Sequence, residues 1–196
     1  ALPPECGPLN SEAFQGSAWL DTLEQEGGVC YAGDCAVARA GNPAKVSFRP
    51  GTRVVFSRLF AACQALVQVV LPAGVTEIGA GAFAGCEKLS RVELPEGLVK
   101  IGKEAFSGCE RLTAAEASQG IARLESSVFQ GCKRLAQVTL PQGLTAIGPY
   151  AFEVCAALSH LDFPAGLTAI EDSAFAGSGL TRADLPDGLE TIGEGA

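Results

Sequence analysis

LPEGLVKIGKEAFSGCERL, residues 94–112, is the stretch that decides the fold, because close copies of it recur along most of the chain. Phenylalanine returns every 23 residues, at Phe60, Phe83, Phe106, Phe129 and Phe152. Cysteine returns at the same interval, at Cys63, Cys86, Cys109, Cys132 and Cys155. One such unit is too short to bury its own apolar face, so neighbouring units must stack and share a core. The repeat therefore predicts a solenoid with a continuous core.

The repeat also sets the domain organisation. Six units cover residues 48–184, and a partial unit follows in 185–196. The sixth unit, 163–184, is one residue short and has Ser178 where the others have cysteine. We expect residues 48–196 to form the solenoid. Residues 1–47 lack the repeat, and we expect them to form an N-terminal capping segment with a short helix that shields the first core from water.

The pattern within a unit predicts its local structure. Residues 89–94 read Leu-x-x-Val-x-Leu, which is typical of a short strand with one face buried. The Pro-x-Gly that follows breaks the strand and turns the chain. Residues 104–109 are too short and too rich in glycine for a full helix, and indicate a turn of 3₁₀ or irregular helix. We expect an α/β repeat solenoid with a parallel β-sheet on one side and short turns or 3₁₀/helical pieces on the other.

The repeat resembles the BspA-like class of leucine-rich repeats over about three-quarters of the chain, residues 48–196. The residues that carry the resemblance are Leu94, Pro95, Gly97, Leu98, Ile101, Gly102, Ala105, Phe106, Gly108, Cys109 and Leu112. The resemblance implies a right-handed solenoid with a parallel sheet on one side. It also implies that the relatives include bacterial surface adhesins and expanded families in protists and unicellular algae, which share no enzyme activity. The unit 117–139 departs most, since Ala117-Ser118-Gln119 replaces Leu-Pro-x, and we expect a local irregularity there within an unbroken stack.

The capping segment has its own signals. Asn10 or Ser11 could begin a helix over roughly 11–26, and Gly27-Gly28 would end it. Its inward side would hold Phe14, Trp19, Leu20 and Leu23. Residues 44–48 then predict the first strand of the sheet. A functional alternative for the segment is that an exposed Trp19 anchors a partner.

The eight cysteines fall into two groups. The five in register occupy one repeat position, and their parallel side chains are badly aimed for disulfides, so we expect buried free thiols that pack as small apolar groups. Cys6, Cys30 and Cys35 lie outside the repeat, and we expect two of them to form a disulfide. Free thiols are the alternative, and a metal site is the weakest reading because the segment has no histidine.

The sequence predicts no enzyme, cofactor or metal centre. Its one histidine, His160, falls on an outward strand position, where a solvated side chain is expected. No nucleophile motif occurs, and the Gly-x-Gly pieces are turns of the repeat and do not precede a helix as a phosphate-binding loop would.

The outward positions of the strands are the candidate binding surface. Alternation along Leu-x-x-Val-x-Leu turns one column of mostly acidic residues and one column of polar or basic residues to the outside. Arg91 should lie beside Glu93, and Arg182 beside Asp184, which offsets part of the repulsion along the acidic column. One interpretation is that these residues form solvated surface ion pairs with no binding role. The functional reading is a docking face for a basic or polar partner, made of Arg91, Glu93, Glu116, Gln137, His160, Asp162, Arg182 and Asp184.

Composition narrows the partner and the compartment. A formal net charge of −8 argues against nucleic acid, and no apolar run is long enough to span a membrane. The chain contains no Met, and its start, Ala1-Leu2-Pro3-Pro4, would suit the end left by a removed targeting peptide. We expect a non-catalytic, secreted or cell-surface module that binds another protein. The alternative is an accessory subunit of a larger assembly at a membrane or in an organelle lumen such as the plastid. The C-terminal end of the stack should be continued, capped or docked.

Overall fold

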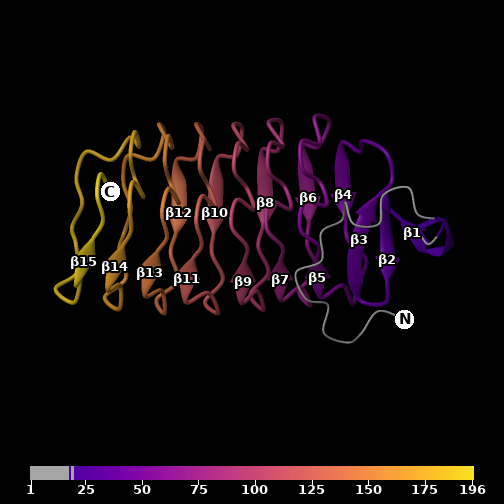
Figure 1. Cartoon of the computed structure of the whole chain (residues 1–196), viewed down its shortest axis with the longest axis horizontal. Helices are drawn as coiled ribbons and strands as arrows, with labels where there is room; N and C mark the ends of the chain where they lie inside the picture. Colours follow the sequence, from indigo (N-terminus) through magenta and orange to yellow (C-terminus); the bar gives the residue numbers. More distant parts are fainter. Residues whose placement is uncertain (1–17, 19) are drawn as a thin grey trace.

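Successive coils of the chain lie side by side along one long axis (Figure 1). The computed structural model describes residue 18 and residues 20–196. These form a β-solenoid of about seven turns with parallel strands. The coils follow one another in sequence order from the N-terminal to the C-terminal end, as the 23-residue repeat predicts.

One side of the solenoid carries the strands predicted from Leu-x-x-Val-x-Leu. They are β4 (Lys45–Ser47), β6 (Gln68–Val70), β8 (Arg91–Glu93), β10 (Ala114–Glu116) and β12 (Gln137–Thr139). β4, β6 and β8 pair in parallel, and β10 pairs with β12. The middle residue of each strand points inward, as with Val92, which is 5% exposed. We call the outward side of these strands the long-strand face.

The opposite side is a second ladder of parallel two-residue strands, which the sequence did not predict. These are β5 (Val54–Val55), β7 (Glu77–Ile78), β9 (Lys100–Ile101), β11 (Arg123–Leu124), β13 (Ala146–Ile147), β14 (Ala169–Ile170) and β15 (Thr191–Ile192). The second residue of each strand is buried in every coil except the last, where Ile192 is exposed. The first residue is exposed or half-buried in every coil except one, where Ala146 is buried. We call this outward side the short-strand face. The α/β expectation is therefore wrong for this side, which is a second β-ladder.

The third side is formed by irregular turns between the two ladders, and the expected helical pieces are absent there. Glu104 has a φ of 60° and Gly108 a φ of 70°, and the same two positions are left-handed in the other units. A right-handed helix needs negative φ at every residue, so two left-handed residues four apart exclude it. Within the described residues the only helix is the one-turn 3₁₀ helix η2 (Leu20–Thr22).

These turns are tied from coil to coil by backbone hydrogen bonds. In the coil at residues 104–108, three alternate amides donate to the next coil: Glu104 to Ser126 (2.9 Å), Phe106 to Val128 (2.9 Å) and Gly108 to Gln130 (2.7 Å). Equivalent triplets join the coils on either side, such as Phe83 to Ala105 and Phe129 to Ala151. The turn side is therefore a third hydrogen-bonded ladder, and it runs through the unit 117–139 without interruption.

Phenylalanine and cysteine fill the core as two stacked columns. The rings from Phe60 to Phe175 lie nearly parallel, with neighbouring centroids 5.3–5.7 Å apart. The predicted column Phe83, Phe106, Phe129 and Phe152 is fully buried, with at most 1% exposed. All five repeat cysteines are buried free thiols, as expected. The repeat register read from the sequence is thus confirmed.

Each core thiol makes a hydrogen bond across the coil boundary that the sequence did not suggest. Its S–H donates to the backbone carbonyl of the phenylalanine one coil earlier, as from Cys109 to Phe83 (3.3 Å) and from Cys132 to Phe106 (3.2 Å). The first one, Cys63, lies at the start of the column and donates to Asn42 Oδ1 at 3.0 Å. Cysteine therefore links neighbouring coils as well as filling space.

The N-terminal segment is a three-stranded antiparallel meander. It consists of β1 (Glu24–Glu26), β2 (Val29–Ala32) and β3 (Cys35–Arg39), and β3 continues in parallel with β5. The helix predicted over roughly 11–26 is wrong for residues 23–26, where β1 forms, and only the one-turn η2 occupies residues 20–22. Residues 11–17, which include Phe14, and Trp19 lie outside the described residues. Gly27 and Gly28 have φ of 59° and 82°, as a tight hairpin turn requires, so they join two strands. β4 confirms the first strand expected at 44–48.

The register of the meander separates two of the three non-repeat cysteines. Cys30 lies opposite Ala38, whereas Cys35 lies opposite Ala32, so their side chains do not face each other. Cys30 is a buried free thiol, and Cys35 packs with Val37 and Phe56. A Cys30–Cys35 disulfide, one of the pairings open from the sequence, is therefore wrong. Cys6 lies outside the described residues.

Candidate binding surface

Four of the eight predicted site residues lie on strands of the long-strand face. Arg91 and Glu93 flank the buried middle residue of β8, and Glu116 and Gln137 occupy outward positions of β10 and β12. All four are exposed, because successive strand residues point to opposite sides. The rigid ladder thus holds these side chains at fixed positions on one surface.

The other four predicted residues are exposed but do not lie on strands, which corrects the strand assignment. Residues 159–162 and 181–184 have no strand pairing, and β12 is the last strand of this ladder. Ala157 N–H donates to Lys133 (3.2 Å), whereas the earlier coil uses Ala136 N–H to Thr113 (3.0 Å). This shift of the backbone bonds takes the following residues out of the ladder. The four predicted residues, which are exposed but lie outside the strands, are His160, Asp162, Arg182 and Asp184.

Side-chain contacts two residues apart accompany most residues of the acidic column. Arg91 lies 2.7 Å from Glu93, and Arg182 lies 2.8 Å from Asp184, as expected. His160 Nε2 also lies 3.1 Å from Asp162 Oδ1, so a third coil has the same arrangement. Glu116 has no such neighbour, since Ala114 occupies the position of Arg91, and it forms no ion pair with any described residue. The acidic column is therefore uncompensated at Glu116.

A groove of about 1250 Å³ opens on the long-strand face beside Glu116. It lies where β8 and β10 face each other. Its lining residues are Ser90, Arg91, Val92, Glu93, Leu94, Glu96, Thr113, Ala114, Glu116, Ala117, Ser118 and Gln119. Four of these carry charge, namely one arginine and three glutamates, so the groove is acidic.

The groove coincides with a break in both strand ladders. On the long-strand face, the N–H of Ser90 donates to Val67, but the equivalent bond from Thr113 to Ser90 is missing in the described chain, and only Thr113 Oγ1 reaches that carbonyl, at 3.5 Å. On the short-strand face, β9 and β11 are likewise unpaired. Figure 1 shows β8 and β10 as neighbouring coils of the continuous stack. The expected irregularity near 117–119 is thus confirmed, and strand pairing between the two coils is lost on both faces.

Several departures from the repeat meet in the coil that follows the break. Ala117 replaces the usual leucine, and Ser118 replaces proline; both are buried, with 5% and 6% exposed. Glu125 stands where Gly102 and Gly148 allow close contact, since a Cβ on Gly102 would lie 2.5 Å from Ala80 N. The side chain of Glu125 therefore opposes the close approach that glycine allows in the other coils. Ser118 Oγ instead donates to the Glu96 carbonyl across the break.

The short-strand face carries ion pairs that sequence reasoning missed. Lys100 Nζ lies 2.8 Å from Glu77 Oε1 in the preceding coil, and Arg123 reaches past the small Ala146 to Glu171 Oε1 at 2.7 Å. These pairs join residues 23 and 48 positions apart, so only the stacking of the coils reveals them. Charge on this face is compensated between coils.

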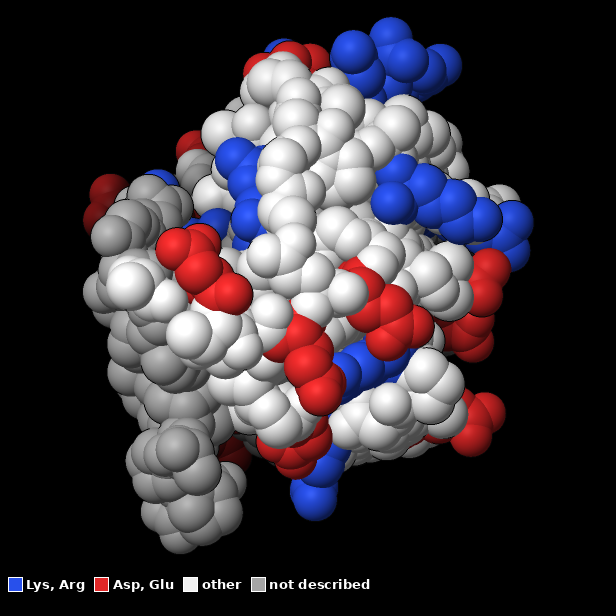
Figure 2. All heavy atoms as spheres, turned by 90° about the vertical axis from the view of Figure 1, so that its right-hand side faces the viewer, with Lys and Arg blue, Asp and Glu red and all other residues white. Residues whose placement is uncertain are grey.

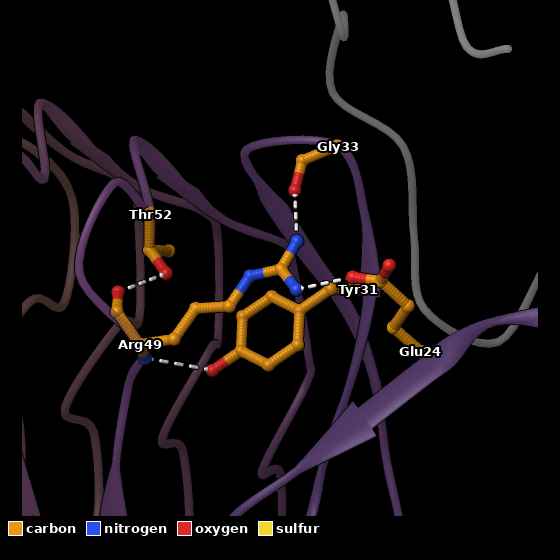
Figure 3. Close-up of polar contacts among 5 residues, drawn as sticks. All are labelled: Glu24, Tyr31, Gly33, Arg49 and Thr52. Carbon is orange, nitrogen blue, oxygen red and sulfur yellow. Dashed lines mark hydrogen bonds and ion pairs between the residues drawn. The ribbon is translucent and has the colours of Figure 1, made fainter.

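Arg49 ties the meander to the first coil of the solenoid (Figure 3). Its guanidinium lies 4.2 Å from the centre of the Tyr31 ring, 2.5 Å from Glu24 Oε2 and 2.6 Å from the Gly33 carbonyl. Its backbone N–H donates to Tyr31 Oη at 3.1 Å, and Thr52 Oγ1 donates to its carbonyl at 2.8 Å. Burial raises the pKa of Tyr31, whose hydroxyl faces the protein interior. Figure 2 shows acidic and basic side chains interspersed on this end of the molecule.

The buried cysteines are poorly suited to nucleophilic or metal chemistry. Burial raises the pKa of Cys86 and Cys155 to about 12, and that of Cys109 and Cys132 well above the ordinary value. Thiols of this kind stay protonated at neutral pH. Among the described residues, no three His, Cys, Asp or Glu side chains are placed to share a metal ion. The described chain also contains no helix that could cross a bilayer.

The last described coil exposes apolar side chains. Leu185 is 42% and Ile192 60% exposed, and a hollow of about 440 Å³ lies next to them, bordered by Phe163, Phe175 and Leu180. The matching side chains of inner coils, such as Ile101, are buried.

Comparison with protein families agrees with this geometry. The family described as "BspA type Leucine rich repeat region" matches in six copies, over residues 1–113 and 76–196. The chain belongs to the BspA-type leucine-rich-repeat family. No curated protein matches this BspA-type repeat protein.

Solved structures of bacterial proteins resemble the BspA-type repeat protein. A leucine-rich cell surface protein from Faecalibacterium prausnitzii is 29% identical, with a TM-score of 0.79 over 87% of this chain and 50% of its own. A leucine-rich-repeat protein from T. pallidum is 32% identical, with a TM-score of 0.76 over 81% of this chain and 77% of its own. One from Bacteroides ovatus is 26% identical, with a TM-score of 0.66 over 76% of this chain and 45% of its own. The BspA-type repeat protein spans about half the length of the F. prausnitzii protein.

Residues of the groove were only partly visible to sequence reasoning. Arg91, Glu93 and Glu116 belong to the predicted columns, but Glu96 and Ser118 do not. The departure of Ala117-Ser118-Gln119 from the BspA-type repeat was the available signal. It predicted an irregularity without showing that the surface opens there.

Proposed function

We propose that this protein is a non-catalytic scaffold that binds another protein through its long-strand face, outside the cytosol. The observation that carries the proposal is the long-strand face itself. An unbroken turn-side ladder, strand pairing on either side of the break and a continuous aromatic column hold its exposed side chains in place. Rigid stacks of this kind make extended binding surfaces from side chains that vary from coil to coil.

Two further observations favour binding over catalysis. His160 has a side chain that is 72% exposed on an open surface, where no neighbouring group but Asp162 is within ion-pair distance in the described chain. The repeat thiols are fully buried and donate to backbone carbonyls, so they are occupied in the core. The titratable groups most often used in catalysis therefore serve packing or face bulk solvent.

The location outside the cytosol rests on the relatives. The F. prausnitzii protein is a cell surface protein by its description, and the family is typical of surface and interaction proteins. The organelle-lumen alternative has no support from these bacterial neighbours. We therefore favour a secreted or surface-displayed module.

The test compares the two strand faces with matched variants. Thr113→Lys, Ala136→Lys and Ser159→Lys together place three lysines on the long-strand face, and Val99→Lys, Ala122→Lys and Thr145→Lys place three on the short-strand face at the same repeat spacing. Immobilised wild type and both variants would be exposed to the proteins of the source organism's surroundings, and retained proteins identified by mass spectrometry. We expect the long-strand variant alone to lose the proteins that wild type retains. Equal retention by both variants would contradict the proposal.

A further inference from the structure

The break between β8 and β10 leaves strand edges without their partners inside an otherwise closed stack. β8 pairs with β6 and β10 pairs with β12, but β8 and β10 do not pair with each other. Within the described chain the Ser90 carbonyl and the Thr113 amide lack the bond that joins the equivalent residues of neighbouring coils. The Ser90 carbonyl is reached instead by Thr113 Oγ1, at 3.5 Å. The long-strand face is therefore irregular at this boundary, and the groove lies on its outward side.

The floor of the groove is held in place by the rest of the fold. Phe106 and Phe129 stack across the break with centroids 5.7 Å apart. The turn-side bonds from Phe106 to Val128 and from Gly108 to Gln130 also cross it, at 2.9 and 2.7 Å. The two coils therefore stay in contact, and the groove is formed on their outward side. A groove that is already formed costs a ligand little ordering of the protein.

Charge selects the occupant. Glu93, Glu96 and Glu116 line the groove against the single Arg91, and Arg91 already lies 2.7 Å from Glu93. Neither Glu96 nor Glu116 forms an ion pair with any residue that the structure describes. Two carboxylates thus remain without a cation on the wall of the groove. A cationic side chain would compensate them, whereas an acidic ligand would be repelled.

We propose that this groove binds an extended segment of a partner protein that carries lysine or arginine side chains. This proposal rests on the proposed function and names the binding site and the chemistry of the partner. The segment lies along the groove on the outward side of β8 and β10. Its cationic side chains meet Glu96 and Glu116. Ser118, Gln119 and Thr113 supply further polar contacts along the wall.

The first experiment uses a labelled synthetic peptide of alternating lysine and serine, about ten residues or roughly 33 Å when extended. Its binding to the full chain would be measured by fluorescence anisotropy at about 0.05 M and about 0.3 M salt. The test variant is Glu96→Gln with Glu116→Gln, which keeps shape and removes charge. The matched control is Glu87→Gln with Glu104→Gln, which removes the same charge from exposed positions outside the long-strand face.

The two variants separate a site from general attraction by an acidic protein. We expect the groove variant to weaken peptide binding by about ten-fold at the lower salt concentration and the control by about two-fold or less. A peptide of alternating glutamine and serine should not bind measurably to the wild type or to either variant. Equal weakening by both variants would show attraction by net charge alone and overturn the proposal, as would tight binding of the neutral peptide.

A second variant tests the role of the opening itself. Ala117→Leu with Ser118→Pro restores the repeat consensus at the corner of the open coil, and Glu96 and Glu116 remain in place. We expect closure of the groove to weaken the lysine–serine peptide by about ten-fold, with the far-ultraviolet spectrum retained as evidence of folding. Unchanged affinity would mean that the charges act without the groove. If the groove variants leave natural partner binding intact while the three-lysine variant of the long-strand face abolishes it, this inference fails and the proposed function stands.

Discussion

Val154 is held in a backbone conformation that suits glycine. Its φ is 57°, and the equivalent residues Gly108, Gly131 and Gly177 have φ between 66° and 72°. A side chain at such a position costs about 1–2 kcal/mol because Cβ approaches the following carbonyl. Val154 is also 43% exposed, so its side chain gains little from burial. The glycine of the repeat is therefore a backbone requirement, and Val154 is tolerated at a cost.

We predict that Val154→Gly raises the stability of the chain by about 0.5–1 kcal/mol. Relief of the left-handed strain exceeds the extra entropy that glycine gives the unfolded chain, about 0.4–1 kcal/mol. The free energy of unfolding in urea would measure the change. Gly131→Val is the control at the same position one coil earlier, and it should lower stability by about 1–2 kcal/mol. A loss of stability in Val154→Gly would contradict the strain argument.

The buried thiols make stability depend on alkaline pH. Burial raises the pKa of Cys86 and Cys155 to about 12 in the folded chain, against an ordinary value of 9.0. Between these values the unfolded chain loses thiol protons that the folded chain keeps. Their contribution is thus fully present below pH 9 and falls as pH rises toward 12, by about 1.4 kcal/mol per pH unit for each thiol.

The corresponding test is unfolding in urea between pH 8 and pH 11, with Ser178 as the natural precedent for serine at this position. We predict that Cys86→Ser with Cys155→Ser loses less stability per pH unit than wild type, because two of the titrating thiols are gone. The side chains of tyrosine and lysine titrate equally in both proteins. Identical slopes would show that these thiols do not titrate differently in the folded and unfolded states.

At the scale of elements, Arg49 joins the meander to the solenoid by three kinds of contact. It stacks on Tyr31 of β2, pairs with Glu24 of β1 and donates to Gly33 in the turn that follows β2. Its own side chain is only 22% exposed, which strengthens these contacts relative to a free surface pair. The capping role of residues 1–47 is a proposal that this joint supports, since β3 also covers the side of β5 facing away from β7.

We predict that Arg49→Ala loosens β1 and β2 while the inner coils stay folded. Loss of the cation–π contact and two hydrogen bonds should cost about 2–3 kcal/mol locally. Amide hydrogen exchange would be measured peptide by peptide. Faster exchange confined to residues 24–32 is the expected result. Arg123→Ala, which breaks the pair with Glu171 far from the meander, is the control. Exchange that is unchanged over residues 24–32 would exclude Arg49 as the joint.

At the scale of the whole molecule, the stack is two ladder segments held together by the turns and core. Strand pairing joins the meander and the coils through β8 and β9, and resumes from β10 and β11 onward. In the described chain the backbone bonds that cross the boundary all lie on the turn side. The aromatic column, the cysteine bonds and side-chain contacts such as Lys133 to Glu110 also cross it. Nearest-neighbour contacts determine the stability of such a stack, so this boundary is its weakest interface.

We predict that the amides of Thr113 and Ala122 exchange at least about ten-fold faster than those of Ala136 and Thr145 one coil later. The first pair lacks the coil-to-coil bonds that the second pair makes, at 3.0 and 2.8 Å, and an amide without a partner exchanges without local opening. Hydrogen exchange followed by nuclear magnetic resonance would resolve these residues. Equal protection would mean that the ladders close across the boundary in solution.

The repeat, its register and the contents of its core were determined by the sequence alone. Phe106 and Cys109 recur at an interval that only stacking can bury, and every copy obeys the same local geometry. The family, the alternation on the long-strand face and the Arg91–Glu93 pair follow from the same regularity. Even the irregular coil was visible, because Ala117 and Ser118 break the pattern.

The tertiary structure alone decided what depends on contacts between coils. The second β-ladder arises because two-residue strands too short to be stable pair with copies of themselves. Locally, Gly27-Gly28 is equally compatible with the end of a helix and with a hairpin turn, and the pairing of β1 with β2 selects the hairpin. The Arg123–Glu171 pair and the groove depend on how closely coils approach, which is set by side-chain volume across the boundary. Local sequence does not encode that distance, because the atoms that determine it lie 23 or more residues apart.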